Sequence, residues 1–211
     1  MRLPSPTIFD YICGMRLRDD SKEILIRQKA VQLIASEGLD GFSMKDLALA
    51  CGISVSTIYV YFKNKEELLF QLILRLRIEQ LSYSIRGLRD DMPFEEGLRL
   101  QWQNRFEYFL AHPLDIRAVE QLKYTPQFQK TTPQLIETMK PHLGRFMENA
   151  VRSGELAEIP FELYWAIGFA PLYSLIEFHV AGGSYANDAF SIKVELIDEA
   201  VKRIAIALKG K

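Results

Sequence analysis

Groups that can donate hydrogen bonds are concentrated in one short stretch of the chain, SMKDLALACGISVSTIYVYFKNKEEL, residues 43–68. Hydroxyl groups beside the free backbone N–H groups of a helix N-terminus can bind phosphate oxygens, and phenol and ammonium groups nearby can add to that binding. The stretch therefore predicts a surface that binds a phosphate backbone. The donors in question are Ser54, Ser56, Thr57, Tyr59, Tyr61 and Lys65.

Two short helices, joined by a tight turn, are expected to position these donors. Ser43 can cap the first helix, which ends near residue 50, and Cys51-Gly52 forms the turn, where glycine adopts a positive φ without steric cost. The second helix is expected over about residues 55–62. Such a pair is a helix-turn-helix, whose second helix enters the DNA major groove. A small apolar core between the two helices consists of Leu47, Ala48, Ile53 and Ile58.

Residues 22–68 resemble the DNA-binding domain of the TetR family of bacterial regulators. That family combines a small residue and a glycine at the turn with Tyr-x-Tyr/His-Phe, a lysine, and a Glu-Leu pair that opens a long helix. The resemblance is specific because few helix-turn-helix proteins share this whole pattern. The matching residues here are Cys51-Gly52, Tyr59-Val60-Tyr61-Phe62, Lys65 and Glu67-Leu68.

The resemblance implies a role for each matching position. It also implies a repressor that binds double-stranded operator DNA as a homodimer and is released by a small apolar or amphipathic effector. Ser56 departs from the family pattern, because many members have Gly or Ala there. By this resemblance, Ser43, Thr57, Tyr59, Tyr61 and Lys65 bind phosphates, whereas Lys45, Val55 and Ser56 face base edges.

Helical periodicity recurs along the rest of the chain, and strand signals are almost absent. The predicted fold is all-α, a nine-helix TetR-like arrangement, with a kink at Pro171. Residues 16–66 are expected to form the DNA-binding domain and residues 67–211 an effector-binding and dimerisation domain, after a disordered extension at 1–15. The expected helices span residues 21–38, 43–50, 55–62, 65–88, 94–111, 114–124, 133–153, 161–181 and 188–209.

Aromatic side chains on the middle helices are candidates for an effector cavity, although ordinary core packing also explains each of them taken singly. Arg105 lies between two of them on one helical face. A buried cation needs an anion, so we expect a protein carboxylate such as Glu120 or Glu177, with the ligand itself as the alternative. The candidates are Trp102, Arg105, Phe106, Phe109, Tyr124, Phe128, Phe146, Trp165, Phe169 and Tyr173.

The last predicted helix carries a narrow apolar seam at alternating spacings of four and three residues, which is typical of helices that pair with one another. We predict that this seam forms the homodimer interface. The alternative is that it packs only within its own subunit. The seam consists of Phe190, Val194, Ile197, Val201, Ile204 and Leu208.

Bulk composition excludes several classes of protein. The 211 residues are 48% hydrophobic and 25% charged with a net charge of −1, as in ordinary globular proteins. The two cysteines and three histidines form no metal-binding pattern, so we predict neither metal nor cofactor. The apolar run at 163–176 is shorter than the roughly 20 residues of a membrane span, which predicts a cytoplasmic protein. An all-helical enzyme or an interaction scaffold stays the alternative, although no catalytic motif supports the former.

Overall fold

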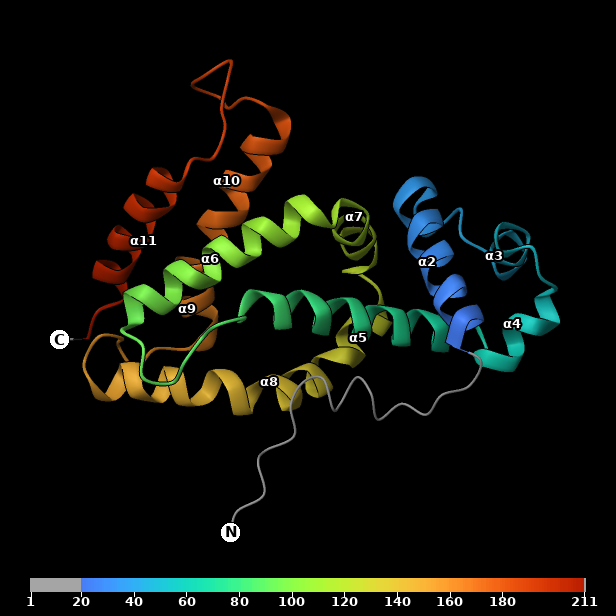
Figure 1. Ribbon diagram of the computed structural model, residues 1–211, viewed down its shortest axis with the longest axis horizontal. Helices are drawn as coiled ribbons and strands as arrows, with labels where there is room; N and C mark the ends of the chain where they lie inside the picture. The colour runs from blue at the N-terminus through green and yellow to red at the C-terminus, as the bar shows by residue number, and fades with distance from the viewer. Residues whose placement is uncertain (1–19, 211) are drawn as a thin grey trace, which may run out of the picture. The chain divides into compact units, whose positions relative to one another are not determined.

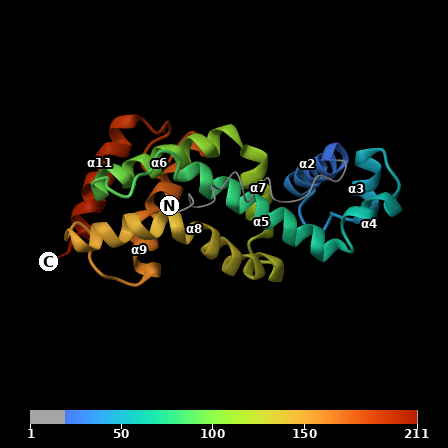
Figure 2. The same cartoon turned by 60° about the horizontal axis from the view of Figure 1, so that its bottom comes forward.

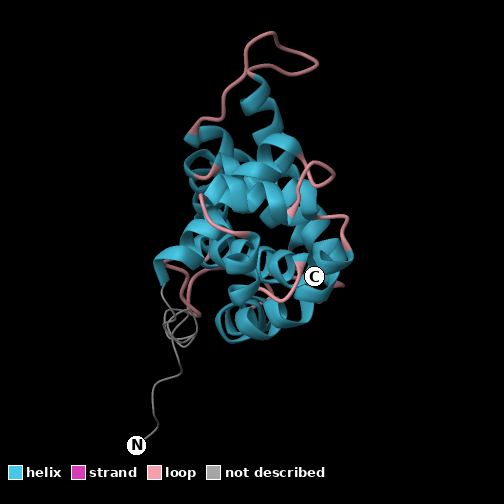
Figure 3. Cartoon of the chain, turned by 90° about the vertical axis from the view of Figure 1, so that its right-hand side faces the viewer, coloured by secondary structure: helices cyan, strands magenta, loops and turns pink. Residues whose placement is uncertain are grey.

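The computed structural model describes residues 20–210, and the extension expected at 1–15 lies outside them. All regular elements of the described chain are helices (Figures 1 and 3), so the predicted all-α fold is confirmed. No helix in this part of the chain is both long and apolar enough to cross a membrane. The helices are α2 (Asp20–Glu37), α3 (Met44–Cys51), α4 (Val55–Tyr61), α5 (Lys65–Ser84), α6 (Phe94–Ala111), α7 (Pro113–Leu122), α8 (Pro126–Arg152), α9 (Phe161–Gly168), α10 (Ala170–Ala181) and α11 (Val194–Leu208).

The helix expected over 161–181 is broken in two, so residues 20–210 hold ten helical segments. Pro171 causes the break, because it has no N–H to donate to the carbonyl one turn earlier. The Leu172 N–H donates to the Phe169 carbonyl at 3.0 Å, which tightens the chain at this point. The Gly168 carbonyl accepts instead from the indole Nε1 of Trp102 at 2.8 Å. The predicted kink is therefore a joint between two helices.

Two helices begin six or seven residues from the expected positions, and α5 ends at residue 84 rather than 88. α8 begins at residue 126 rather than 133, because the Thr125 hydroxyl accepts from the Phe128 N–H at 3.2 Å and Pro126 suits the first turn. α11 begins at residue 194 rather than 188, since Lys193 is still extended, with φ −113° and ψ 158°. Hydrophobic periodicity did not predict these starts, because helix caps and extended backbone depend on local contacts that periodicity does not reveal.

The chain divides into two compact units, and the first comprises the described part of residues 1–82 together with 112–138. Its core joins α2, α3, α4 and the first part of α5 with α7, which adds the fully buried Ala118 and Leu122. The predicted helix-turn-helix core residues Leu47, Ala48 and Ile58 are buried in it. The expected functional boundary at 66/67 stays a prediction, because these units are defined by packing alone.

The second unit comprises residues 83–111 and 139–210 of the described chain. Its core is rich in aromatic side chains, including the fully buried Trp102, Phe146 and Phe169. Gly97 lets α6 approach α8 closely, since a Cβ at this position would lie 2.4 Å from two ring carbons of Phe146. Glycine is therefore required at this contact because a larger side chain has no room, and not because the backbone has a positive φ.

Candidate nucleic-acid interface

The turn between α3 and α4 depends on Gly52, whose φ of +66° is unfavourable for other residues. The Gly52 N–H donates to the Leu49 carbonyl at 3.1 Å, and the Ile53 N–H donates to the Ala48 carbonyl at 3.1 Å. This is the Schellman arrangement, which ends a helix and turns the chain sharply. The predicted helix-turn-helix is thus present, and Figure 2 shows α3 and α4 next to one another.

A cluster of hydroxyl groups lies at the start of α4, as the sequence predicts. The Ser54 Oγ accepts from the Thr57 N–H at 3.1 Å, and it lies 2.7 Å from the Ser56 hydroxyl and 2.8 Å from the Thr57 hydroxyl. Ser54 and Ser56 are exposed and Thr57 is half-buried. Three hydroxyls within hydrogen-bond reach of one another can therefore present donors to one anionic group outside the protein.

The remaining predicted contact residues of α3 and α4 differ in exposure. Tyr59 is 49% exposed and Lys45 is exposed, so both side chains are available to a partner. Val55 and Tyr61 are half-buried and pack against the first core. For these two residues, packing on the core and contact with DNA are compatible, because a half-buried side chain has one side on the core and another in solvent.

Lys65 is anchored close to the start of α3. Its Nζ donates to the Phe42 carbonyl at 2.6 Å and lies 5.3 Å from the centroid of the Phe42 ring. The next residue, Ser43, caps α3 by accepting from the Asp46 N–H at 3.2 Å and donating to the Asp46 carboxylate. The structure therefore brings Ser43 and Lys65 together, although they are 22 positions apart in sequence.

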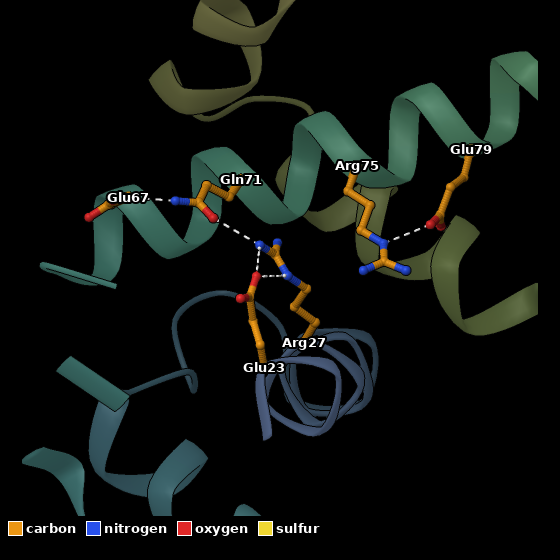
Figure 4. Close-up of polar contacts among 6 residues, drawn as sticks. All are labelled: Glu23, Arg27, Glu67, Gln71, Arg75 and Glu79. Carbon is orange, nitrogen blue, oxygen red and sulfur yellow. Dashed lines mark hydrogen bonds and ion pairs between the residues drawn. The ribbon is translucent and has the colours of Figure 1, made fainter. Parts of the chain in front are cut away.

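A polar network, shown in Figure 4, holds the start of α5 against α2. Arg27 is 6% exposed and donates to the Glu23 carboxylate at 2.6 Å and to Gln71 Oε1 at 2.8 Å. Gln71 donates in turn to Glu67 Oε1 at 3.1 Å, and Glu67 Oε2 accepts from the Lys63 N–H at 2.7 Å. The network therefore extends from α2 to the link between α4 and α5.

Sequence reasoning missed Arg27, although its side chain lies against the end of α4. Its guanidinium lies 5.2 Å from the centroid of the Phe62 ring, the residue that ends α4. Glu23 and Arg27 have the i,i+4 spacing of a helical ion pair, which was the one available signal. The contact with Gln71 spans 44 positions and has no signature in the sequence.

Comparisons with known proteins agree with this geometry. Residues 26–72 match the family model described as bacterial regulatory proteins of the tetR family. An uncharacterized HTH-type transcriptional regulator from Haemophilus influenzae is 28% identical over 176 residues, which cover 82% of this chain and 87% of that protein. A TetR family transcription regulator from Marinobacter aquaeolei VT8 has a crystal structure with a TM-score of 0.78 at 25% identity, covering 93% of this chain and 100% of that one. A TetR-family regulator from Haemophilus influenzae Rd gives 0.76 at 25% identity, covering 92% and 100%.

The chain contains a DNA-binding domain of the TetR family, and over most of its length it is similar to regulators of that family. It is a DNA-binding transcriptional regulator with the all-helical fold of that family, and the comparisons favour neither an enzyme nor a scaffold.

The effector candidates of this regulator fall in two separate units. Tyr124 and Phe128 belong to the first unit. Tyr124 is 86% exposed, and the centroid of the Phe128 ring lies 4.1 Å from Cζ of the Arg77 guanidinium. The other eight belong to the second unit. Three of these, Trp102, Phe146 and Phe169, are no more than 1% exposed, so they are core residues of that unit whatever else they do.

Arg105 lacks the protein carboxylate that the sequence favours as its partner. Its Nη1 donates to the Tyr173 hydroxyl at 3.1 Å, and its Nε has no hydrogen-bond partner among the described residues. Glu120 pairs with Lys123, and Glu177 is exposed on α10. The expectation of a protein partner is therefore wrong for the described chain, because the carboxylates considered are engaged elsewhere or face solvent.

The predicted dimer seam is largely buried within its own unit. Ile197, Val201, Ile204 and Leu208 are at most 8% exposed and belong to the second core. Of the two remaining seam residues, Val194 is 59% exposed and Phe190 is half-buried. Alternating spacing of three and four also suits a helix that packs on its own subunit, which is the alternative that the sequence left open.

Pockets and metal-type clusters add little to the candidate site. A hollow of about 570 Å³ in the first unit is lined by residues 36–40 with Gln121, Tyr124 and Thr125, so it includes one effector candidate. Within residues 20–210, no three His, Cys, Asp or Glu side chains gather where they could hold a metal ion.

Proposed function

We propose that this TetR-family regulator is a homodimeric repressor that binds double-stranded operator DNA through α3 and α4 and is released by a small apolar or amphipathic molecule. We assign DNA binding to residues 16–66 and effector binding and dimerisation to residues 67–211. The observation that carries the DNA-binding part is the group of exposed hydroxyls at Ser54 and Ser56 with Tyr59 beside them and Lys65 anchored near Ser43.

Phosphate binding and base reading are divided between residues by their chemistry. The hydroxyls of Ser43, Thr57, Tyr59 and Tyr61 and the Lys65 ammonium are assigned to phosphates, since such contacts position a protein on DNA without reading sequence. The second group faces base edges, where an ammonium, a methyl group and a hydroxyl can each discriminate between bases. This group consists of Lys45, Val55 and Ser56.

Dimerisation is assigned to the outer surface of α9, α10 and α11 in place of the buried seam. Two-fold symmetric operators require two recognition helices about 34–36 Å apart, and a symmetric dimer supplies them. Apolar side chains that remain exposed on these three helices support the assignment, because a monomeric protein seldom exposes so many apolar side chains on one part of its surface. They are Phe161, Leu163, Val180, Val194 and Ile206.

Release from DNA requires the effector to bind the off-DNA conformation more tightly than the DNA-bound one, because equal affinity for both would shift nothing. A difference of roughly 2–3 kcal/mol lowers operator affinity by about 30- to 150-fold. The eight effector candidates of the second unit, which are Arg105 and seven aromatic residues in or against the second core, are assigned to this role.

The test is binding to the DNA upstream of the protein's own coding region, measured by fluorescence anisotropy at several salt concentrations. Lys65→Gln keeps a donor for the Phe42 carbonyl but removes the charge. We expect it to weaken binding to every DNA sequence alike and to reduce the log–log salt slope by about 0.9. Lys130→Gln, an exposed lysine of α8, is the matched control and should leave the slope unchanged. An unchanged slope in a folded Lys65→Gln protein would exclude Lys65, and no DNA binding by the unaltered protein would refute the proposal.

A further inference from the structure

Arg105 is the one charged side chain that is buried in the described part of the second unit, with 6% of it exposed. Its surroundings are neutral: the Tyr173 hydroxyl at 3.1 Å, the Phe169 ring at 4.5 Å and the Trp165 ring at 5.5 Å. None of the ion pairs among residues 20–210 includes Arg105. A buried cation without an anion is costly, and aromatic faces compensate only part of that cost.

Two buried donors in this place have no acceptor. One is the Arg105 Nε, and the other is the Tyr164 hydroxyl on α9. Burial raises the pKa of Tyr164 well above its ordinary value, while the positive charge of Arg105 acts in the opposite direction. The phenol therefore stays protonated at neutral pH and remains a donor. A buried donor normally has a partner in protein or solvent, so two without one, the first of them on the cation itself, require explanation.

Apolar aromatic groups surround these donors. The Trp165 ring lies 5.1 Å from the Phe169 ring and 6.1 Å from the Tyr173 ring, and the Tyr164 ring contacts Phe169 at 5.7 Å. Trp165 is 36% exposed and Tyr173 is half-buried, so these two members of the group reach the surface, Trp165 the further. A ligand that reached Arg105 from outside would pass the Trp165 ring and bury its own apolar part against these aromatic faces.

We infer that Arg105 binds the carboxylate of an amphipathic ligand, with the Tyr164 hydroxyl as second donor and the aromatic group Trp165, Phe169 and Tyr173 around the apolar body. The inference rests on the proposed function, because it names the chemical class of the effector. A carboxylate carries only acceptors, which matches the unpaired donors, and its single charge matches the single guanidinium. A phosphate would bring additional negative charge to a place with no second buried cation.

The test compares probes that differ in the head group alone. Straight-chain carboxylates of increasing length are titrated against the full-length protein below their micelle concentrations, with the matching primary alcohols and alkyl phosphates. Binding is followed by tryptophan fluorescence and calorimetry. At the best chain length, we expect the carboxylate to bind about 10- to 100-fold more tightly than the alcohol, which is the usual range for a hydrogen bond to a charged group.

Variants of α6 and α9 assign this preference to its residues. Arg105→Gln should abolish the preference for carboxylate over alcohol, whereas Arg105→Lys should retain part of it. Tyr164→Phe should lower it about 3- to 10-fold, as expected for one hydrogen bond. Arg99→Gln is the matched control on the same helix, because Arg99 pairs with Glu95 and Asp198, and it should leave the preference unchanged. If Arg105→Gln does not fold, Arg105→Lys and Tyr164→Phe decide the matter.

Several results would overturn the inference: equal affinities for carboxylate and alcohol, tighter binding of the phosphate, no binding of any probe, or a preference that survives in folded Arg105→Gln. DNA binding without any probe is measured on the same preparations. Carboxylate binding by a protein that ignores DNA would refute the proposed regulator and leave the anion site intact. DNA binding by a protein that does not distinguish the head groups would refute the anion site alone.

Discussion

Replacing Gly97 should destabilise the protein, although glycine is normally the least favourable residue in a helix interior after proline. A Cβ at this position would lie 2.4 Å from two ring carbons of Phe146 and 3.0 Å from a methyl carbon of Leu88. Carbon atoms prefer separations of about 3.5–4.0 Å, so the ring must move by about 1 Å. Phe146 is fully buried and stacks on Phe94 at 6.1 Å, which leaves it little room to move.

The expected magnitude is the balance of two opposing effects. Overpacking a core costs typically about 1–3 kcal/mol, and alanine gains about 1 kcal/mol over glycine in a helix. Because the contact is short and the ring is confined, we expect Gly97→Ala to lower the free energy of unfolding by about 1–2 kcal/mol. Gly144→Ala on α8 is the matched control, since its new Cβ would meet only the Lys140 side chain at 3.9 Å. We expect that control to gain up to about 1 kcal/mol.

Urea unfolding followed by tryptophan emission measures both variants, because Trp102 and Trp165 lie in the same unit as the two glycines. Protein concentration is held constant, and the midpoints are compared at equal m-values. Adding Phe146→Leu to Gly97→Ala should recover part of the loss by relieving the contact. A Gly97→Ala protein as stable as Gly144→Ala would show that α6 and α8 adjust freely, which would refute the reasoning.

Three further predictions concern other parts of the molecule. Arg27→Met should lower the stability of the first unit by about 2 kcal/mol in thermal melts, whereas Arg75→Met, from an exposed pair, should change it by less than about 0.5 kcal/mol. Burial raises the pKa of the Cys51 thiol. In a variant whose sole cysteine is Cys51, the folded protein should therefore react with a disulfide reagent more slowly than the unfolded protein, and its rate should rise with pH. Equal rates for the folded and unfolded protein would contradict this. Ile206→Glu or Val180→Glu should give monomers in sedimentation, and persistent dimers would place the interface elsewhere.

The features that the sequence predicted correctly are those that neighbouring residues determine. The turn at Gly52 and the cap at Ser43 depend on two to five consecutive residues, so residue type and order suffice. The all-α fold follows from periodicity that extends along the chain. The family pattern combines these local signals, which is why residues 22–68 were recognisable without a structure.

Features that depend on distant contacts were not predictable. The spacing of Ile197, Val201 and Ile204 indicates an apolar face but not whether the same chain or another one covers it, and the structure shows the same chain. The missing anion of Arg105 is a property of its surroundings on three helices. Pro171 indicates a disturbance, yet whether the helix bends or ends depends on the bond that Trp102 makes to the Gly168 carbonyl.

The composition of the first unit has a consequence for the order of events during synthesis. Its core contains residues of α2 to α5 and also Ala118 and Leu122 of α7, and residues 83–111 between them belong to the other unit. The ribosome must therefore add about 46 residues after Leu76 before this core has all its members, which takes about 2–9 s at 5–20 residues per second. Throughout that interval the surface of α2 that α7 later covers is open to chaperones and proteases. A nascent chain stalled before residue 113 should consequently be cleaved within α2 far faster than one stalled after residue 138.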